Sequence, residues 1–97
     1  MASSPYEGTF ILVPTLAEDE LDTAVEQVKT YITSRGGEVT NTDSWGRRRM
    51  YHAIKGHRDA NYVLIDFTAD PATVHDVESS LLLDDSVIRS LIVRADK

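Results

Sequence analysis

The sequence predicts a single α+β domain in which a four-stranded antiparallel sheet carries two helices on one of its faces. Four segments are rich in β-branched and aromatic residues, two others repeat apolar residues at helical spacing, and turn-forming residues separate them. Their order along the chain is strand, helix, strand, strand, helix, strand, which is the order of two split βαβ units. The 97 residues make one domain, and we expect its ordered core to run from about residue 6 to residue 94.

The first strand is predicted over Tyr6–Pro14, and the unbroken apolar run Phe10–Val13 predicts a central position in the sheet. A helix follows, with Thr15 and Glu18 at the spacing of a capping box and two glycines at its end. The acidic residues near its start are explained by the helix dipole, without an active site. Five apolar residues fall on one face of this helix: Leu21, Ala24, Val25, Val28 and Ile32.

A long extended segment is predicted from Glu38 to Ile54, and Gly46 inside it suggests a bulge or a close approach of another backbone. Residues 55–60 read as a polar turn, and Asn61–Thr68 as a second strongly apolar strand. Two strands joined by such a short turn form an antiparallel hairpin.

The second helix is predicted to begin with Asp70 as its N-cap and Pro71 at its first helical position. Its apolar face holds Val74, Val77 and Leu81, and a β-branched last strand follows, with a short charged tail. The complete order predicts a ferredoxin-like fold that leaves one face of the sheet open. An open sheet face is a natural docking surface for RNA or for another protein.

The composition excludes several classes of function. The chain has no cysteine, and therefore no disulfide framework, no thiolate nucleophile and no zinc site built on cysteine. Its start lacks the pattern of a secretion signal, and no apolar stretch approaches the roughly 20 residues that cross a bilayer. We expect a soluble, cytoplasmic protein without a membrane contact.

Charge is distributed very unevenly along the chain. The whole sequence has a formal charge of −6, yet residues 45–58 contain five of the ten basic residues and no carboxylate. The remaining residues include five basic and sixteen acidic side chains. Because exposed charges beyond about 8–10 Å are largely screened at physiological salt, the local charge decides what this segment can bind.

The three consecutive arginines must be partly exposed. In a strand, Arg47 and Arg49 share one face and Arg48 lies on the other, and an unpaired buried guanidinium is very costly. A solvated edge strand, protected from aggregation by its charges, would explain them without any ligand. The absence of carboxylates favours an anionic partner instead, with Trp45, Tyr51 and Tyr62 near enough to offer stacking surfaces.

The sequence gives no indication of a metal site or of a catalytic motif. His52, His57 and His75 have no spacing that supports a metal site, so we expect none. The sequence contains neither a GxxxxGK[ST] phosphate loop nor a GxSxG nucleophile elbow.

The segments "YEGTFILVPTLAEDEL", "WGRRRMYHAIKGHRDANYVLIDF" and "SVIRSLIVR" resemble the bacterial small-subunit ribosomal protein six family. The resemblance covers Tyr6 to Arg94. Its most specific element is an ordered motif, in which an aromatic residue and a glycine are followed by basic residues, then by a hydrophobic residue, and finally by an isoleucine and a lysine. The chain departs from the family pattern at His52 and Ala53, where a Tyr-Pro pair is usual.

The resemblance implies a ferredoxin-like, non-enzymatic constituent of the small ribosomal subunit, without cofactor or small-molecule substrate. It implies binding to the central domain (platform) of 16S ribosomal RNA as a heterodimer with ribosomal protein eighteen. The RNA-binding residues that we expect are Trp45, Arg47, Arg48, Arg49, Lys55, Arg58 and Arg89.

Two other functions are compatible with the same topology. A regulatory or protein-interaction module would have a ligand pocket at its helix–sheet loops and would not need the arginine run. An enzyme resembling acylphosphatases would need a phosphate loop after the first strand, where this chain has the acidic "VPTLAED".

Overall fold

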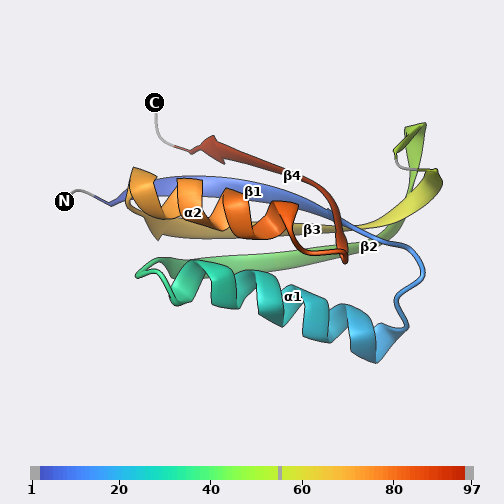
Figure 1. The fold of residues 1–97 in the computed structure, drawn as a ribbon, viewed down its shortest axis with the longest axis horizontal. Coiled ribbons are helices and arrows are strands. Elements are labelled where there is room, and N and C mark those ends of the chain that lie inside the picture. Colours follow the sequence, from blue (N-terminus) through green and yellow to red (C-terminus); the bar gives the residue numbers. More distant parts are fainter. Residues whose placement is uncertain (1–2, 55, 96–97) are drawn as a thin grey trace.

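The computed structural model describes residues 3–54 and 56–95, and it confirms the predicted fold class. One four-stranded sheet has the strand order β2-β3-β1-β4, and every pair of neighbouring strands is antiparallel (Figure 1). The elements are β1 (Ser4–Leu12), α1 (Glu18–Thr33), β2 (Glu38–Ile54), β3 (His57–Ala69), α2 (Pro71–Leu82) and β4 (Val87–Arg94).

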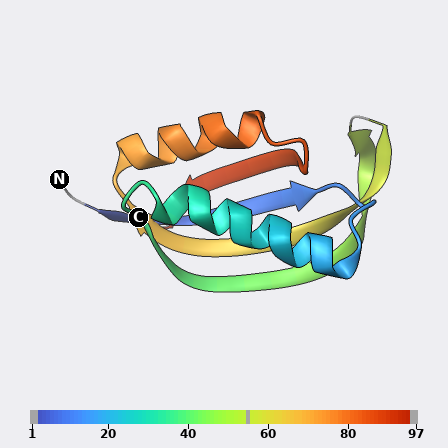
Figure 2. The ribbon, with the colours of Figure 1, turned by 60° about the horizontal axis from the view of Figure 1, so that its bottom comes forward.

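Both helices cover the same face of the sheet, and the other face is left open (Figure 2). The burial of the residues alternates along β1 and so distinguishes the two faces of the sheet. Tyr6, Phe10 and Leu12 are buried, while Glu7 is exposed and Ile11 is only partly buried. The position of β1 between β3 and β4 confirms that the first apolar strand is central. Neither helix of the described residues is long and apolar enough to cross a membrane.

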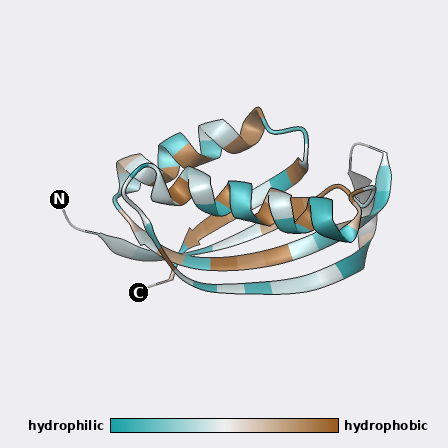
Figure 3. Cartoon of the chain, turned by 90° about the horizontal axis from the view of Figure 1, so that it is seen from below, coloured by the Kyte–Doolittle hydropathy of each residue, from teal (hydrophilic) through white to brown (hydrophobic). Residues whose placement is uncertain are grey.

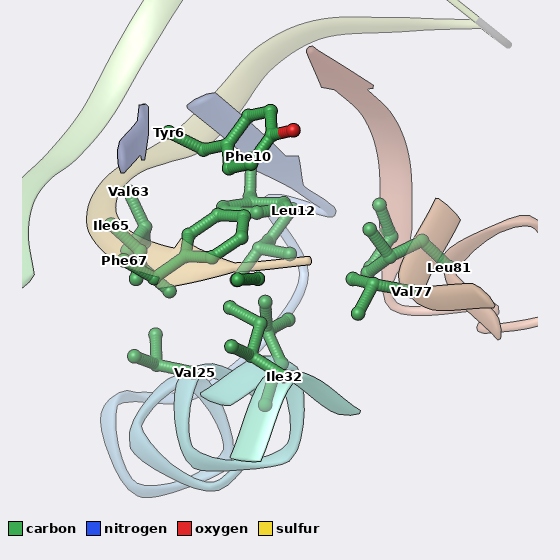
Figure 4. Close-up of a cluster of buried hydrophobic side chains, with 14 residues drawn as sticks. Tyr6, Phe10, Leu12, Val25, Ile32, Val63, Ile65, Phe67, Val77 and Leu81 are labelled. Atoms are coloured by element: carbon green, nitrogen blue, oxygen red, sulfur yellow. The ribbon is translucent and has the colours of Figure 1, made fainter. Parts of the chain in front are cut away.

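The main core lies between the sheet and the helices (Figure 4). The two phenylalanines of the chain, Phe10 and Phe67, are almost completely buried there, and Tyr6 stacks on Phe67 with ring centroids 5.7 Å apart. The helices contribute their predicted apolar faces, and brown, hydrophobic bands alternate with teal ones along both of them (Figure 3). The most deeply buried residues of these faces are Val28, Ile32, Val77 and Leu81.

The predicted start of α1 was wrong by two residues. The helix begins at Glu18 with Ala17 as N-cap, and Glu20, rather than a residue paired with Thr15, accepts a hydrogen bond from the Ala17 backbone N–H at 2.8 Å. An acidic side chain at the third helical position can satisfy this N–H group whatever residue is the N-cap. The start of α2 is as predicted, because the Asp70 side chain accepts from the Ala72 backbone N–H and Pro71 opens the helix.

The β2–β3 hairpin is longer than predicted, since β3 begins at His57 and residues 57–60 are strand rather than turn. The polar side chains of these residues suggested a turn, but their backbone pairs with β2, as in Arg49 opposite Asp59. The end of this hairpin projects beyond the rest of the sheet (Figure 1). Toward the hairpin end, Asn61 is the last residue of β3 that pairs with β1, so Arg48, Arg49 and Arg58 lie on an extended arm beyond it.

A hydrogen bond of 2.7 Å from the Tyr31 hydroxyl to Asp84 links α1 to the turn before β4. Burial, this hydrogen bond and the negative charge of Asp84 all raise the pKa of Tyr31 above its ordinary value. A raised pKa in the folded state means that the bond stabilises the protein below the ordinary pKa of about 10, and that this stabilisation is lost as the pH rises through the folded-state pKa.

We expect Tyr31→Phe to be less stable than the parent at pH 7 by about 0.5–1.5 kcal/mol, with the difference shrinking in alkaline solution. Urea unfolding of both proteins at neutral pH and above about pH 10.5 measures this difference. A difference that stays constant with pH would contradict the stabilising role of the bond.

Candidate nucleic-acid interface

A bulge in β2 sets the position of Trp45. The pairing register with β3 shifts between Ser44 and Gly46, so that Trp45 has no direct partner in the ladder. Gly46 has a φ of 76°, a left-handed conformation that favours glycine. The predicted bulge is therefore confirmed, and it leaves Trp45 on the surface with 47% of the residue exposed.

The three arginines after the bulge alternate between the two faces, as expected. Arg47 pairs with Asn61 and Arg49 with Asp59, whereas Arg48 between them pairs with Ala60. Arg47 differs from the other two, because its guanidinium donates a hydrogen bond to the Pro14 carbonyl and so holds the hairpin to the loop after β1.

All five described arginines of the expected interface are exposed, namely Arg47, Arg48, Arg49, Arg58 and Arg89. Within the described part of the chain, none of them forms a salt bridge. Their charges are thus available to an outside partner. Lys55 and the side chain of Tyr51 lie outside the described residues.

Trp45, Arg48 and Tyr62 line one open hollow of about 410 Å³ on the uncovered face of the sheet. The indole N–H of Trp45 donates a hydrogen bond of 3.0 Å to Asp43, which restrains the ring. Of the aromatic residues that the sequence suggested for stacking, the structure thus brings Trp45 and Tyr62 together beside an arginine. Nothing in the sequence indicated that Asp43 would accept this hydrogen bond.

The strand register places Arg89 at the same end of the open face. Gly46 pairs with Tyr62, Tyr62 with Ile11, and Ile11 with Arg89, so these residues form one row across the four strands. With strands about 4.8 Å apart, the backbone of Arg89 is roughly 10 Å from that of Tyr62. Residues that are distant in sequence are thereby joined in one basic and aromatic surface.

A second, smaller hydrophobic cluster supports this surface. Met50, Ala60 and Ile88 are buried in it, with partly buried Ile11, Val13 and Tyr62 packed against them. Tyr62 therefore belongs both to this cluster and to the wall of the hollow, which fixes its position. Sequence reasoning missed the cluster, because its members come from four strands and no single strand shows the pattern.

The other half of the open face is acidic and apolar. Glu7 and Asp66 lie directly opposite each other on β1 and β3, and one carboxylate oxygen of Asp66 is buried without a hydrogen-bond partner. On the neighbouring edge strand, Leu91 and Val93 are 56% and 45% exposed. Like charges opposite each other are destabilising, so this half is suited to a cationic partner.

No group of three or more His, Cys, Asp or Glu side chains is arranged to hold a metal ion within residues 3–54 and 56–95. His57 is partly buried in the hairpin and His75 is exposed on α2. A further hollow lies beside the start of α1 and is lined partly by Asp19, Glu20 and Asp84, which would repel a phosphate.

Similarity to known proteins extends over the whole fold. The family model for Ribosomal protein S6 matches residues 5–94. The chain is 41% identical over 93 residues to the small ribosomal subunit protein bS6 of Mycolicibacterium paratuberculosis, covering 96% of this chain and 97% of the relative. It is 37% identical over 92 residues to bS6 of Moorella thermoacetica, covering 95% and 94%.

Among solved structures, the crystal structure of 30S ribosomal protein S6 from Thermotoga maritima is similar, with a TM-score of 0.90 and 28% identity. The alignment covers 96% of this chain and 88% of that protein. The similarity therefore includes all six elements and not the basic segment alone.

Proposed function

Because the chain belongs to the ribosomal protein S6 family of the small ribosomal subunit, we propose that it binds the central domain (platform) of 16S ribosomal RNA together with ribosomal protein eighteen. In this proposal it is a structural, ribosome-associated protein of the cytoplasm. The observation that carries the proposal is the projecting hairpin, with unpaired, exposed arginines and no carboxylate between residues 45 and 58.

The chemistry of this segment suits phosphate. Arginine presents a planar fork that contacts two phosphate oxygens at once, and it also stacks on bases. The proposed RNA-binding residues are Trp45, Arg47, Arg48, Arg49, Lys55, Arg58 and Arg89. Among these, Arg47 has a second role in holding the hairpin to the Pro14 carbonyl.

The proposed protein partner is basic, because the RNA footprint of this chain is small and the rest of its charge is negative. Outside residues 45–58 the formal charge is −11. The half of the open face around Glu7, Asp66, Leu91 and Val93 combines carboxylates with exposed apolar side chains. Complementary charge on a partner would hold it in register there and leave the basic half for RNA.

No catalytic role is proposed, since the family is one of ribosomal structural proteins. The acidic start of α1 occupies the position where an enzyme resembling acylphosphatases would bind phosphate. A regulatory module remains the alternative function, and the experiment below separates it from the ribosomal one.

We expect the protein to co-sediment with the small subunit in equal amounts when a cell lysate is separated on a sucrose gradient. Arg48→Glu combined with Arg49→Glu should move most of it to the free fractions, because two attractive charges become repulsive. Arg47 is left unchanged because of its contact with Pro14. Mass spectrometry of the fractions gives the distribution.

The matched control is Lys29→Glu with Arg35→Glu, which changes the net charge equally but lies on α1 and the turn after it. It should co-sediment like the parent protein. If the parent protein itself stays among the free proteins, the ribosomal function is wrong and the regulatory module becomes the leading alternative.

A further inference from the structure

We propose that the hollow lined by Trp45, Arg48 and Tyr62 binds one unpaired nucleobase of RNA by stacking. This inference rests on the proposed RNA-binding function and adds to it the chemical group that is recognised. Phosphate contacts alone would position the RNA, whereas an inserted base would fix which nucleotide lies at this end of the sheet.

The aromatic groups of the hollow are held in place before any ligand arrives. The bulge at Gly46 projects Trp45 from the strand, and the hydrogen bond to Asp43 restrains the indole. Tyr62 is fixed from below by its packing against the Met50 cluster. Because these side chains are already ordered, a ligand that stacks on them loses less conformational entropy on binding.

The indole N–H is already bonded to Asp43, so the exposed part of Trp45 that remains for a ligand is chiefly its ring. An aromatic ring beside a tyrosine and an arginine is the usual surface on which single-stranded nucleic acids stack their bases. Arg48 can stack on the same base or contact the phosphate next to it.

The charges around the hollow favour a base over a phosphate inside it. The Asp43 carboxylate lies beside Trp45 and would repel a phosphate placed against the ring, but it does not repel a neutral base. The hollow of about 410 Å³ is within the 300–1,000 Å³ range of small-ligand sites. A base inside a duplex is already stacked, and therefore the occupant is an unpaired nucleotide.

The test uses the fact that Trp45 is the only tryptophan of the chain, so that its fluorescence reports on the hollow alone. The full-length protein is titrated at about 50 mM salt, where charge attraction is strong. One probe is a short single-stranded RNA of mixed sequence, and the other has the same backbone without its bases. Fluorescence anisotropy of end-labelled RNA gives the affinity independently.

We expect the intact RNA to quench Trp45 and to bind more tightly than the abasic RNA, which should leave the emission unchanged. Trp45→Ala and Tyr62→Ala should each lower the affinity for the intact RNA by about 5- to 150-fold, which is the range for the loss of one stacked base. Neither substitution should lower the affinity for the abasic RNA. Tyr62→Phe, which keeps the ring, should bind like the parent, and thermal unfolding shows whether Tyr62→Ala remains folded.

Three outcomes would overturn the inference. If both RNAs bind with equal affinity and leave the fluorescence of Trp45 unchanged, the protein binds RNA but does not stack a base in the hollow. If a peptide rich in lysine and arginine, titrated as a third probe, quenches the fluorescence of Trp45 and neither RNA does, the hollow is a protein contact. If neither RNA binds at all, the proposed function fails, and the inference fails with it.

Discussion

Leu12→Ala is expected to lower the free energy of unfolding by about 2–5 kcal/mol, the range for removing a buried leucine side chain. Leu12 is completely buried in the main core at the end of the central strand β1. Domains of this kind are stable by only about 5–15 kcal/mol, so the variant should unfold at a much lower urea concentration. Denaturation followed by circular dichroism measures the change.

Leu91→Ala is the matched control, because it removes the same atoms from the open face, where Leu91 is 56% exposed. We expect its effect on the isolated protein to be within about 0.5 kcal/mol. Equal losses from the two substitutions would mean that the open face is packed as tightly as the helix-covered one, which would contradict the two-faced sheet.

RNA binding is expected to weaken by about a hundredfold when salt is raised from 50 to 200 mM. This follows if roughly four arginines each neutralise one phosphate, because each contact adds about 0.9 to the slope of log affinity against log salt. Arg48→Gln and Arg49→Gln should each reduce that slope by about 1, since each removes one phosphate contact without introducing repulsion. Filter binding at four salt concentrations gives the slopes.

Arg35→Gln removes the same charge from the turn between α1 and β2, far along β2 from the hairpin end, and should leave the slope unchanged. If all three substitutions reduce the slope equally, the RNA responds to net charge and not to the hairpin surface. The location of the interface would then be wrong, even though the protein binds RNA.

The two halves of the open face have opposite chemistry, and this follows from how the strands pair. The basic hairpin and Arg89 meet at one end through the row from Gly46 to Arg89, while Glu7 and Asp66 meet nearer the other. Asp43 beside Trp45 and Asp59 opposite Arg49 also lie at the basic end and offset part of its positive charge, while Glu7 and Asp66 lie apart from it.

The sequence by itself determined the order of the elements and the two helical faces. Apolar residues repeat with local periods, as from Leu21 to Ile32, and such periods are set by the geometry of a single element. It also determined that the arginines could not all be buried, because no fold can bury three consecutive unpaired guanidinium groups cheaply. The bulge at Gly46 was likewise a local property of a glycine within a strand.

Only the tertiary structure decided which residues share a surface. Tyr62, Ile11 and Arg89 come together through pairings between distant segments, and a shift of one residue in the register would turn each side chain to the other face. The contact of Arg47 with Pro14 and the cluster of Met50, Ala60 and Ile88 depend on the same pairings. Local sequence specifies what each strand can bury, but the register between strands decides which side chains meet.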